Sequence, residues 1–338
     1  MDVRTFCRQS HVLIVAGKGG VGKTTMVAAL ARMAADAGLS VLVVELEGRP
    51  GVTDAFGHEV PLGHDLAVLD AAGAAGIGDG VDGDDDTPIP RGTVQARMIT
   101  PDHALSEYFD AHGMRRFTRR LTSTGIFEVV AGAIPGIRDV LVLGKIKQLE
   151  RAGIADLILV DAPATGHAMT FLTSASGLVD AARGGPVKDQ AADVVELLND
   201  PGRCQVGLVT LPEEMPVNEV IEAAYQLEDK VGIKLGPVIV NACYPAVAGL
   251  EVRAADAAAA AGVTLDADVL GALDAASRFR RTRQDLQQEQ IGRLTHELPL
   301  PTVEVPYVFS GSVGPAELRV LADALADQVR SLPERVAR

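Results

Sequence analysis

The chain has 338 residues, of which 47% are hydrophobic and 4% aromatic, a composition typical of a soluble globular protein with one large α/β domain or two small ones. Its formal net charge of −14 argues against nucleic acid or anionic membranes as partners, because these need a basic face. The cysteines, Cys7, Cys204 and Cys243, are too far apart in sequence to predict a zinc site or a disulfide framework. Because no run of about 18 apolar residues occurs, we expect no membrane-spanning segment and a cytoplasmic protein.

A phosphate-binding loop is predicted near the start of the chain, directly after the apolar run 12–15. Residues 17–25 fit the pattern G-x-x-x-x-G-K-S/T, in which glycines let backbone N–H groups wrap a phosphate chain. We expect the Lys23 ammonium to reach the β- and γ-phosphates and the Thr24 hydroxyl to bind Mg²⁺. The expected nucleotide-contacting residues of the loop are Gly17, Gly19, Gly20, Val21, Gly22, Lys23, Thr24 and Thr25.

Further apolar runs alternate with helical stretches along the chain, at 41–44, 157–160, 206–209, 238–240 and around Val303. Such runs are typical of strands buried on both faces, so we predict a doubly wound, mainly parallel sheet. In sheets of this kind ligands bind beyond the carboxyl ends of the strands. Besides the phosphate-binding loop, the residues expected at that edge are Glu45, Glu47, Asp161 and Asn241.

The remaining segments predict a mostly helical subdomain mounted on this core within a single domain, 1–338. The core segments are expected at about 8–60, 153–166, 203–245 and 298–338, and the helical insertions at about 100–150, 167–200 and 250–297. Short strands are also expected at 66–69 and 94–98, with a mobile acidic loop at 78–91 between them. A last amphipathic helix is predicted at about 315–331.

Asp161 follows a fully apolar strand, which is where nucleotide-hydrolysing enzymes place a carboxylate that contacts Mg²⁺ through its bound water. An aspartate after a strand is also a common turn former, but the phosphate-binding loop favours the metal-binding role.

Lys18 extends the loop to G-K-G-G-x-G-K-S/T-T, which resembles the deviant P-loop of dimeric ATPases related to ArsA, MinD and the nitrogenase iron protein. Residues 161–167, D-A-P-A-T-G-H, are similar to the D-T-A-P-T-G-H switch II signature of ArsA-type ATPases, with the proline displaced to Pro163. Residues 53–56, T-D-A-F, resemble the end of that family's switch I.

The resemblance implies a nucleotide-sandwich dimer in which Lys18 reaches the partner's phosphates. It places Glu47 at the catalytic aspartate that orients the attacking water, Asn241 at the adenine-reading asparagine, and Pro306 in the base pocket. His167 either contributes to switch II or is a partly buried histidine with a backbone partner.

We therefore expect a Mg²⁺-dependent ATPase that couples ATP hydrolysis to movement of a helical, partner-binding subdomain. Its partners are expected to be a second copy or a paralogous ATPase, and a protein client or a membrane partner. The alternatives are a catalytically weak nucleotide-binding subunit of a heterodimer and a MinD/ParA-like positioning ATPase. Two basic clusters, 115–120 and 278–283, are expected as solvated helix faces rather than docking patches.

Overall fold

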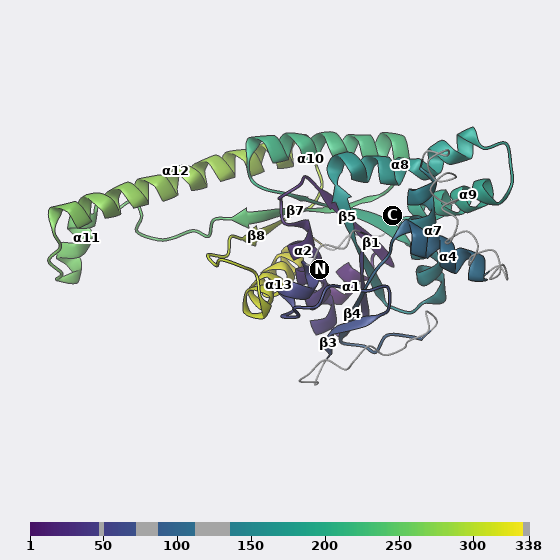
Figure 1. Ribbon diagram of the computed structural model, residues 1–338. Helices are drawn as coiled ribbons and strands as arrows, with labels where there is room; N and C mark the ends of the chain where they lie inside the picture. The colour runs from purple at the N-terminus through teal and green to yellow at the C-terminus, as the bar shows by residue number, and fades with distance from the viewer. Residues whose placement is uncertain (47–50, 72–86, 112–135, 334–338) are drawn as a thin grey trace.

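A single eight-stranded sheet organises the computed structural model, which describes residues 1–46, 51–71, 87–111 and 136–333 (Figure 1). The strand order is β3-β4-β2-β5-β1-β6-β7-β8. All neighbouring pairs are parallel except β3 and β4, which pair antiparallel at one edge. The strands are β1 (Val12–Gly17), β2 (Val41–Glu45), β3 (Ala67–Ala71), β4 (Thr93–Met98), β5 (Leu157–Ala164), β6 (Cys204–Thr210), β7 (Leu235–Cys243) and β8 (Thr302–Pro306).

Helices cover both faces of the sheet, as the continuous apolar strands predict. One face packs against α1 (Val3–Cys7), α2 (Lys23–Asp36), α3 (Val52–Ala55) and α13 (Pro315–Ser331). The other packs against α4 (Pro101–Ala111), α7 (Ile137–Ala152), α8 (Thr165–Ala181), α9 (Pro186–Asn199), α10 (Glu214–Gln226), the π-helical turn η1 (Leu227–Val231) and the end of α12 (Ala267–Glu297).

The central strand β1 shows why this arrangement is stable. Val12 and Ile14 belong to the core beneath α7 and α8, whereas Val15 points into the opposite core against α2. All three are at most 1% exposed. Because both sides of the strand are buried, every position is apolar and the doubly wound α/β fold is confirmed.

The short strands expected at 66–69 and 94–98 are present as β3 and β4 and join the same sheet, outside the expected core segments. Of the acidic loop expected at 78–91, residues 78–86 lie outside the described residues. The whole basic cluster 115–120 also lies outside them. In the described part of the chain, no helix is long and apolar enough to cross a membrane.

Two helices extend away from the rest of the molecule (Figure 1). The last third of α12 lies on the body and its first part reaches far beyond it, with the short α11 (Ala254–Ala261) at the far end. No residue of α11 is buried, and the buried residues of α12 are Gln287, Ile291 and Leu294, all in its last third.

Candidate functional site

The predicted phosphate-binding loop connects β1 to α2 at the carboxyl edge of the sheet, where the strand order reverses. Gly20 and Gly22 have φ angles of 86° and 88°, which favour glycine. A β-carbon on Gly17 would overlap the carbonyl oxygen of Val209 in β6, and one on Gly22 would overlap the side-chain amide of Asn241. These glycines are therefore required by the path of the loop.

The loop forms one wall of a cavity of about 450 Å³. From the loop and the start of α2 the lining residues are Gly19, Gly20, Gly22, Lys23 and Thr24. From β2, β5 and the residue after β2 they are Glu45, Leu46, Asp161, Ala162, Pro163 and Ala164, with Gly51 beside them. Of the other predicted loop residues, Gly17 ends β1, Val21 is buried beneath the loop, and Thr25 is half-buried in the first turn of α2. The volume and the glycine wall suit a chain of phosphates.

Positive charge is concentrated at the N-terminus of α2. The first N–H groups of a helix have no partners within the helix and carry the positive end of its dipole. Lys23 is the first residue of α2, and its Nζ donates a hydrogen bond to the carbonyl of Lys18, 3.1 Å away. The ammonium group thus lies against the loop, beside the cavity that it lines.

Thr24 and Asp161, the two residues expected at the metal site, meet at the cavity. The Thr24 hydroxyl donates to Asp161 Oδ2 at 2.6 Å, while Asp161 Oδ1 is buried and accepts no hydrogen bond. Burial raises the pKa of Asp161, and the Thr24 hydrogen bond and the Lys23 charge oppose this shift. A hydroxyl and an unsatisfied carboxylate oxygen suit Mg²⁺, which takes one or two protein oxygens together with waters and phosphate oxygens.

Glu45 is a second buried carboxylate beside Asp161, and sequence reasoning assigned it no role. The two residues are register partners on β2 and β5, and Glu45 is only 3% exposed. Its Oε1 accepts a hydrogen bond from the backbone N–H of Val52, 3.3 Å away at the start of α3. Burial raises the pKa of Glu45 to about 7, and the Val52 hydrogen bond opposes the shift. The signal in the sequence was its place at the carboxyl end of an apolar strand.

The predicted catalytic residue Glu47 lies outside the described residues, together with 48–50. The switch I segment is described again from Gly51, and residues 52–55 form α3. Glu45 therefore contacts the first helix that the structure describes after Glu47, through the N–H of Val52.

The two predicted base-pocket residues lie in different surroundings. Asn241 Nδ2 donates to the carbonyl of Val21 in the loop at 2.9 Å, and its Oδ1 accepts from the N–H of Ala242 at 2.8 Å. Pro306 ends β8 and lines a separate cavity of about 610 Å³ between α12 and α13. Asn241 thus contacts the phosphate-binding loop, whereas Pro306 does not line the phosphate cavity.

The remaining predicted residues, Lys18 and His167, do not line the phosphate cavity. Lys18 Nζ forms an ion pair with Glu219 Oε1 of α10 at 2.5 Å, and the two side chains are 36% and 35% exposed. His167 is exposed in the first turn of α8, and its charge lowers the pKa of Asp139, which burial raises.

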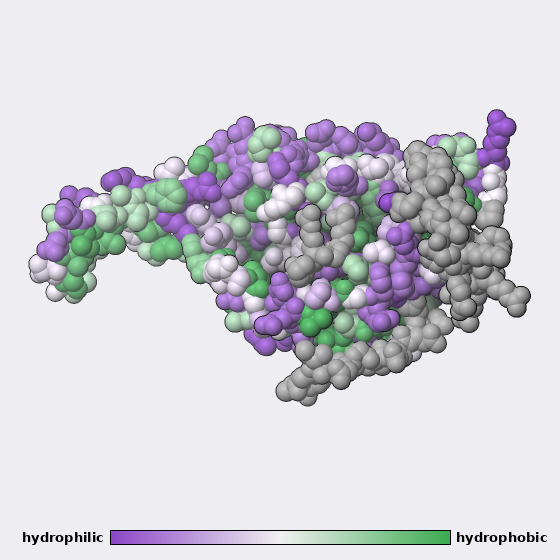
Figure 2. All heavy atoms as spheres, viewed as in Figure 1, coloured by the Kyte–Doolittle hydropathy of each residue, from purple (hydrophilic) through white to green (hydrophobic). Residues whose placement is uncertain are grey.

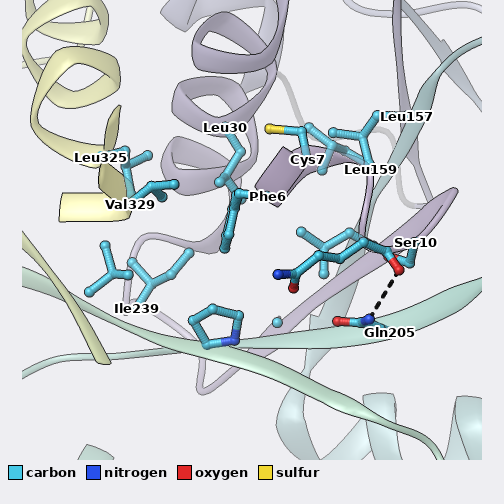
Figure 3. A pocket seen from close by; sticks show the side chains of 15 residues that line it. Phe6, Cys7, Ser10, Leu30, Leu157, Leu159, Gln205, Ile239, Leu325 and Val329 are labelled. Atoms are coloured by element: carbon cyan, nitrogen blue, oxygen red, sulfur yellow. Dashed lines mark hydrogen bonds between the residues drawn. The ribbon is translucent and has the colours of Figure 1, made fainter. Parts of the chain in front are cut away.

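A third cavity, drawn in Figure 3, lies at the opposite ends of the strands. It is lined mainly by apolar side chains, among them Phe6, Leu30 and Leu325, and its volume is about 30 Å³, room for little more than a water molecule. Gln205, at its edge, donates to the carbonyl of Gln9 at 3.3 Å. This space is a packing void of the core rather than a ligand site.

A glycine loop between a buried strand and a helix, with a lysine and a threonine opening the helix and an aspartate facing them from a neighbouring strand, defines a P-loop nucleotide-binding protein. The same geometry places the charged groups at the topological switch point of the sheet.

The comparisons with known proteins identify the family. A model of the CobQ/CobB/MinD/ParA nucleotide-binding domain matches residues 12–289. The ATPase BagA of Mycobacterium tuberculosis is 34% identical over 335 residues, covering 93% of this chain and 92% of that protein. A Halobacterium salinarum protein whose name is that of an arsenical pump-driving ATPase is 28% identical over 259 residues, 70% of this chain and 36% of that protein. The Neurospora crassa ATPase get3 is 26% identical over 220 residues, 64% and 56% of the two chains. The chain belongs to this domain family and to its ArsA-like ATPases.

The loop geometry predicts different costs for two glycine substitutions. Gly17→Ala is expected to lower the free energy of unfolding by about 1–3 kcal/mol, because its β-carbon overlaps the backbone of β6. Gly19→Ala is the matched control: its β-carbon meets only Ala164 Cβ, at 3.9 Å, so we expect a change below about 0.5 kcal/mol. Urea denaturation without nucleotide measures both, and equal free energies of unfolding would contradict the packing.

The raised pKa of Glu45 predicts a pH dependence of stability. The folded protein keeps a proton on Glu45 that the unfolded chain releases near the ordinary value of 4.5. The retained proton stabilises the folded protein. This contribution to the free energy of unfolding is fully present below the unfolded pKa and is lost as the pH rises through the folded pKa of about 7. Between about pH 5 and pH 8, the wild type should therefore lose up to about 3 kcal/mol more stability than Glu45→Gln, which keeps an acceptor for Val52.

Chemical denaturation without nucleotide at both pH values tests this, with the exposed Glu59→Gln as control. An identical pH slope in the wild type and Glu45→Gln would show that Glu45 is ionised in the folded protein.

Proposed function

We propose that this protein is a Mg²⁺-dependent ATP-hydrolysing switch that acts as a dimer. The observation that carries the proposal is the convergence of Lys23, Thr24 and Asp161 on one cavity walled by the glycine loop. Lys23 supplies a cation for the phosphates, and Thr24 and Asp161 supply oxygens for the metal. The membership of the chain among ArsA-like ATPases supports ATP as the nucleotide.

Hydrolysis requires that phosphate charge be neutralised and that a water be aimed in line at the γ-phosphate. The loop N–H groups and Lys23 serve the first requirement. Bound Mg²⁺ would further neutralise charge on the β- and γ-phosphates, held by Thr24 and, through its water ligands, by Asp161. Glu47 follows Glu45 and Leu46, which both line the cavity, and in the proposal its carboxylate orients the attacking water.

In the proposed dimer Lys18 acts across the interface on the partner's phosphates. Within one chain Lys18 is paired with Glu219, and both side chains are about one third exposed. Ion pairs of this exposure contribute about 0.2–1 kcal/mol, so a polyphosphate can displace Glu219 easily. Glu219 thus holds Lys18 in the single subunit and releases it when the nucleotide of the partner arrives.

The coupling to the helical layer follows the chain itself. β5 carries Asp161 and leads without a break into α8, which packs against α7 and α9. In the proposal, a shift of residues 161–167 on loss of the γ-phosphate moves α8 and, with it, the surface that binds a client. Such coupling needs an element with two packed arrangements, and α8 is the candidate.

A steady-state phosphate-release assay with Mg²⁺-ATP tests the proposal. We expect turnover by the wild type, and a loss of at least about 100-fold in Lys23→Ala, because the phosphates lose their cation. Lys230→Ala, an exposed lysine in η1, should leave the rate unchanged. Glu47→Gln should bind ATP normally and hydrolyse it slowly.

A wild type that binds ATP without turnover would contradict the hydrolytic role. It would favour the alternative of a nucleotide-binding subunit that completes a paralogous ATPase.

The Lys18–Glu219 pair makes a separate prediction. Glu219→Gln removes the competing charge, so ATP-analogue-dependent dimerisation should become up to about fivefold tighter. Glu222→Gln, an exposed acid one turn along α10, is the matched control and should behave as the wild type. Sedimentation velocity measures the dimer constant, and equal constants for the two variants would contradict the competition.

A further inference from the structure

The two helices that leave the body form what we call the arm, residues 254–279, comprising α11 and the first part of α12 (Figure 1). None of its residues is buried. Large apolar side chains on it are nonetheless exposed, including Val263 at 51%, Val269 at 44% and Leu273 at 45%. Figure 2 shows hydrophobic side chains out to the end of the arm. A continuous stretch of such side chains is typical of a surface that another molecule covers.

The arm projects past the edge of the sheet that carries the nucleotide site. Gln287 of α12 accepts from the N–H of Tyr244 at 2.8 Å and donates to the carbonyl of Ala242 at 3.1 Å, so it lies level with the end of β7. The preceding residues of α12 lie beyond that end, and 267–279 alone extend about 20 Å. The end of β7 adjoins the phosphate-binding loop, because Asn241 contacts Val21 at 2.9 Å.

The side of α12 that is buried on the body continues onto the arm. Gln287, Ile291 and Leu294 are the buried residues of the helix. Stepping back from Gln287 in the alternating spacing of three and four residues that keeps one helix face gives Arg283, Arg280, Ala276, Leu273 and Val269. We call Val269, Leu273 and Ala276 the arm seam. The arm seam is apolar, as a packed helix face is, but it lies beyond the body of this chain.

The charges next to the arm seam indicate the character of its partner. Between Val269 and Arg283, the charged residues on the seam side of the helix, Arg280 and Arg283, are both positive. Arg280 lies over the ring of Tyr244 at 4.1 Å, and Arg283 pairs with Glu213 at 3.3 Å. Both arginines are therefore already partnered within the chain, so the arm seam itself presents apolar rather than charged contacts to a partner.

We infer that the arm seam packs against a second copy of this chain, seated on the nucleotide-binding edge of the first. The inference rests on the proposed nucleotide-dependent dimer, in which the second copy faces the phosphate-binding loop so that Lys18 can reach it. An arm that projects past the same edge then lies alongside that copy. In a two-fold dimer each arm packs against the other subunit, so the interface contains two equivalent arm contacts.

Charged residues in the arm seam test the inference. The double variant Val269→Asp/Leu273→Asp should weaken dimerisation with a non-hydrolysable ATP analogue at least about tenfold, because two aliphatic contacts are lost twice per dimer. Nucleotide binding by the single subunit should be unchanged. The control is Val320→Asp on α13, the same change at an exposed valine, which is 54% exposed. Sedimentation velocity gives the dimer constants, and nucleotide titration gives the affinity of the subunit.

The outcomes separate this inference from the proposed function. If the wild type dimerises with the analogue and the double variant dimerises equally well, the arm inference is wrong and the proposed dimer stands. If the wild type binds the analogue but stays monomeric, the in-trans dimer and the arm contact are both wrong. If the wild type does not bind nucleotide, the proposed function itself fails.

Cross-linking identifies what the arm contacts. The native thiols of Cys7, Cys204 and Cys243 are buried, and burial raises their pKa, so they react slowly with maleimides. A single added thiol, Leu273→Cys, carrying a maleimide photo-cross-linker should give an analogue-dependent cross-linked dimer whose second site maps to the body of the other copy. Cross-links confined to one chain would overturn the inference.

Discussion

The N-terminus of α2 has to attract a polyanion, although the chain as a whole has a formal net charge of −14. The structure concentrates positive groups there: the N–H groups of the first turn, which carry the positive end of the helix dipole, the Lys23 ammonium and, nearby in the loop, Lys18. The tight path of the loop is the condition for this arrangement, because Gly17 and Gly22 leave no room for a side chain against β6 and Asn241. The doubly wound sheet places that loop between the ends of its central strands, and every other element of the site is defined relative to it.

Two carboxylates face this positive group from neighbouring strands. Glu45 and Asp161 are register partners, and burial raises the pKa of both. The pair is electrostatically unfavourable when both groups are ionised, and in the proposed function a bound cation would offset that cost. Glu45 also holds the start of α3 through Val52, which links the charge state of the site to the segment that follows Glu47.

Much of this could be read from the sequence, because the decisive signals are local. The strand runs predicted the parallel sheet, and Thr24 and Asp161, the two residues expected near the metal, lie 2.6 Å apart. The contacts that escaped prediction join distant segments. Lys18 and Glu219 are separated by 201 positions, and no sequence pattern predicts that they pair. The contact of Asn241 with Val21 and the burial of Glu45 likewise depend on tertiary packing. Arg280, expected on a solvated face, stacks on Tyr244 because β7 ends beside it.

The account depends most on Lys18 acting on the other subunit, and mixing two variants tests this directly. Lys18→Ala and Lys23→Ala are each expected to be inactive in phosphate release. A mixed dimer has one complete site if Lys18 acts in trans, with Lys23 from one chain and Lys18 from the other. An equal mixture should then recover about a quarter of the wild-type rate, because half of randomly formed dimers are mixed and each carries one working site. No recovery above the separate variants would contradict the account, because it would place both lysines on the nucleotide of their own chain.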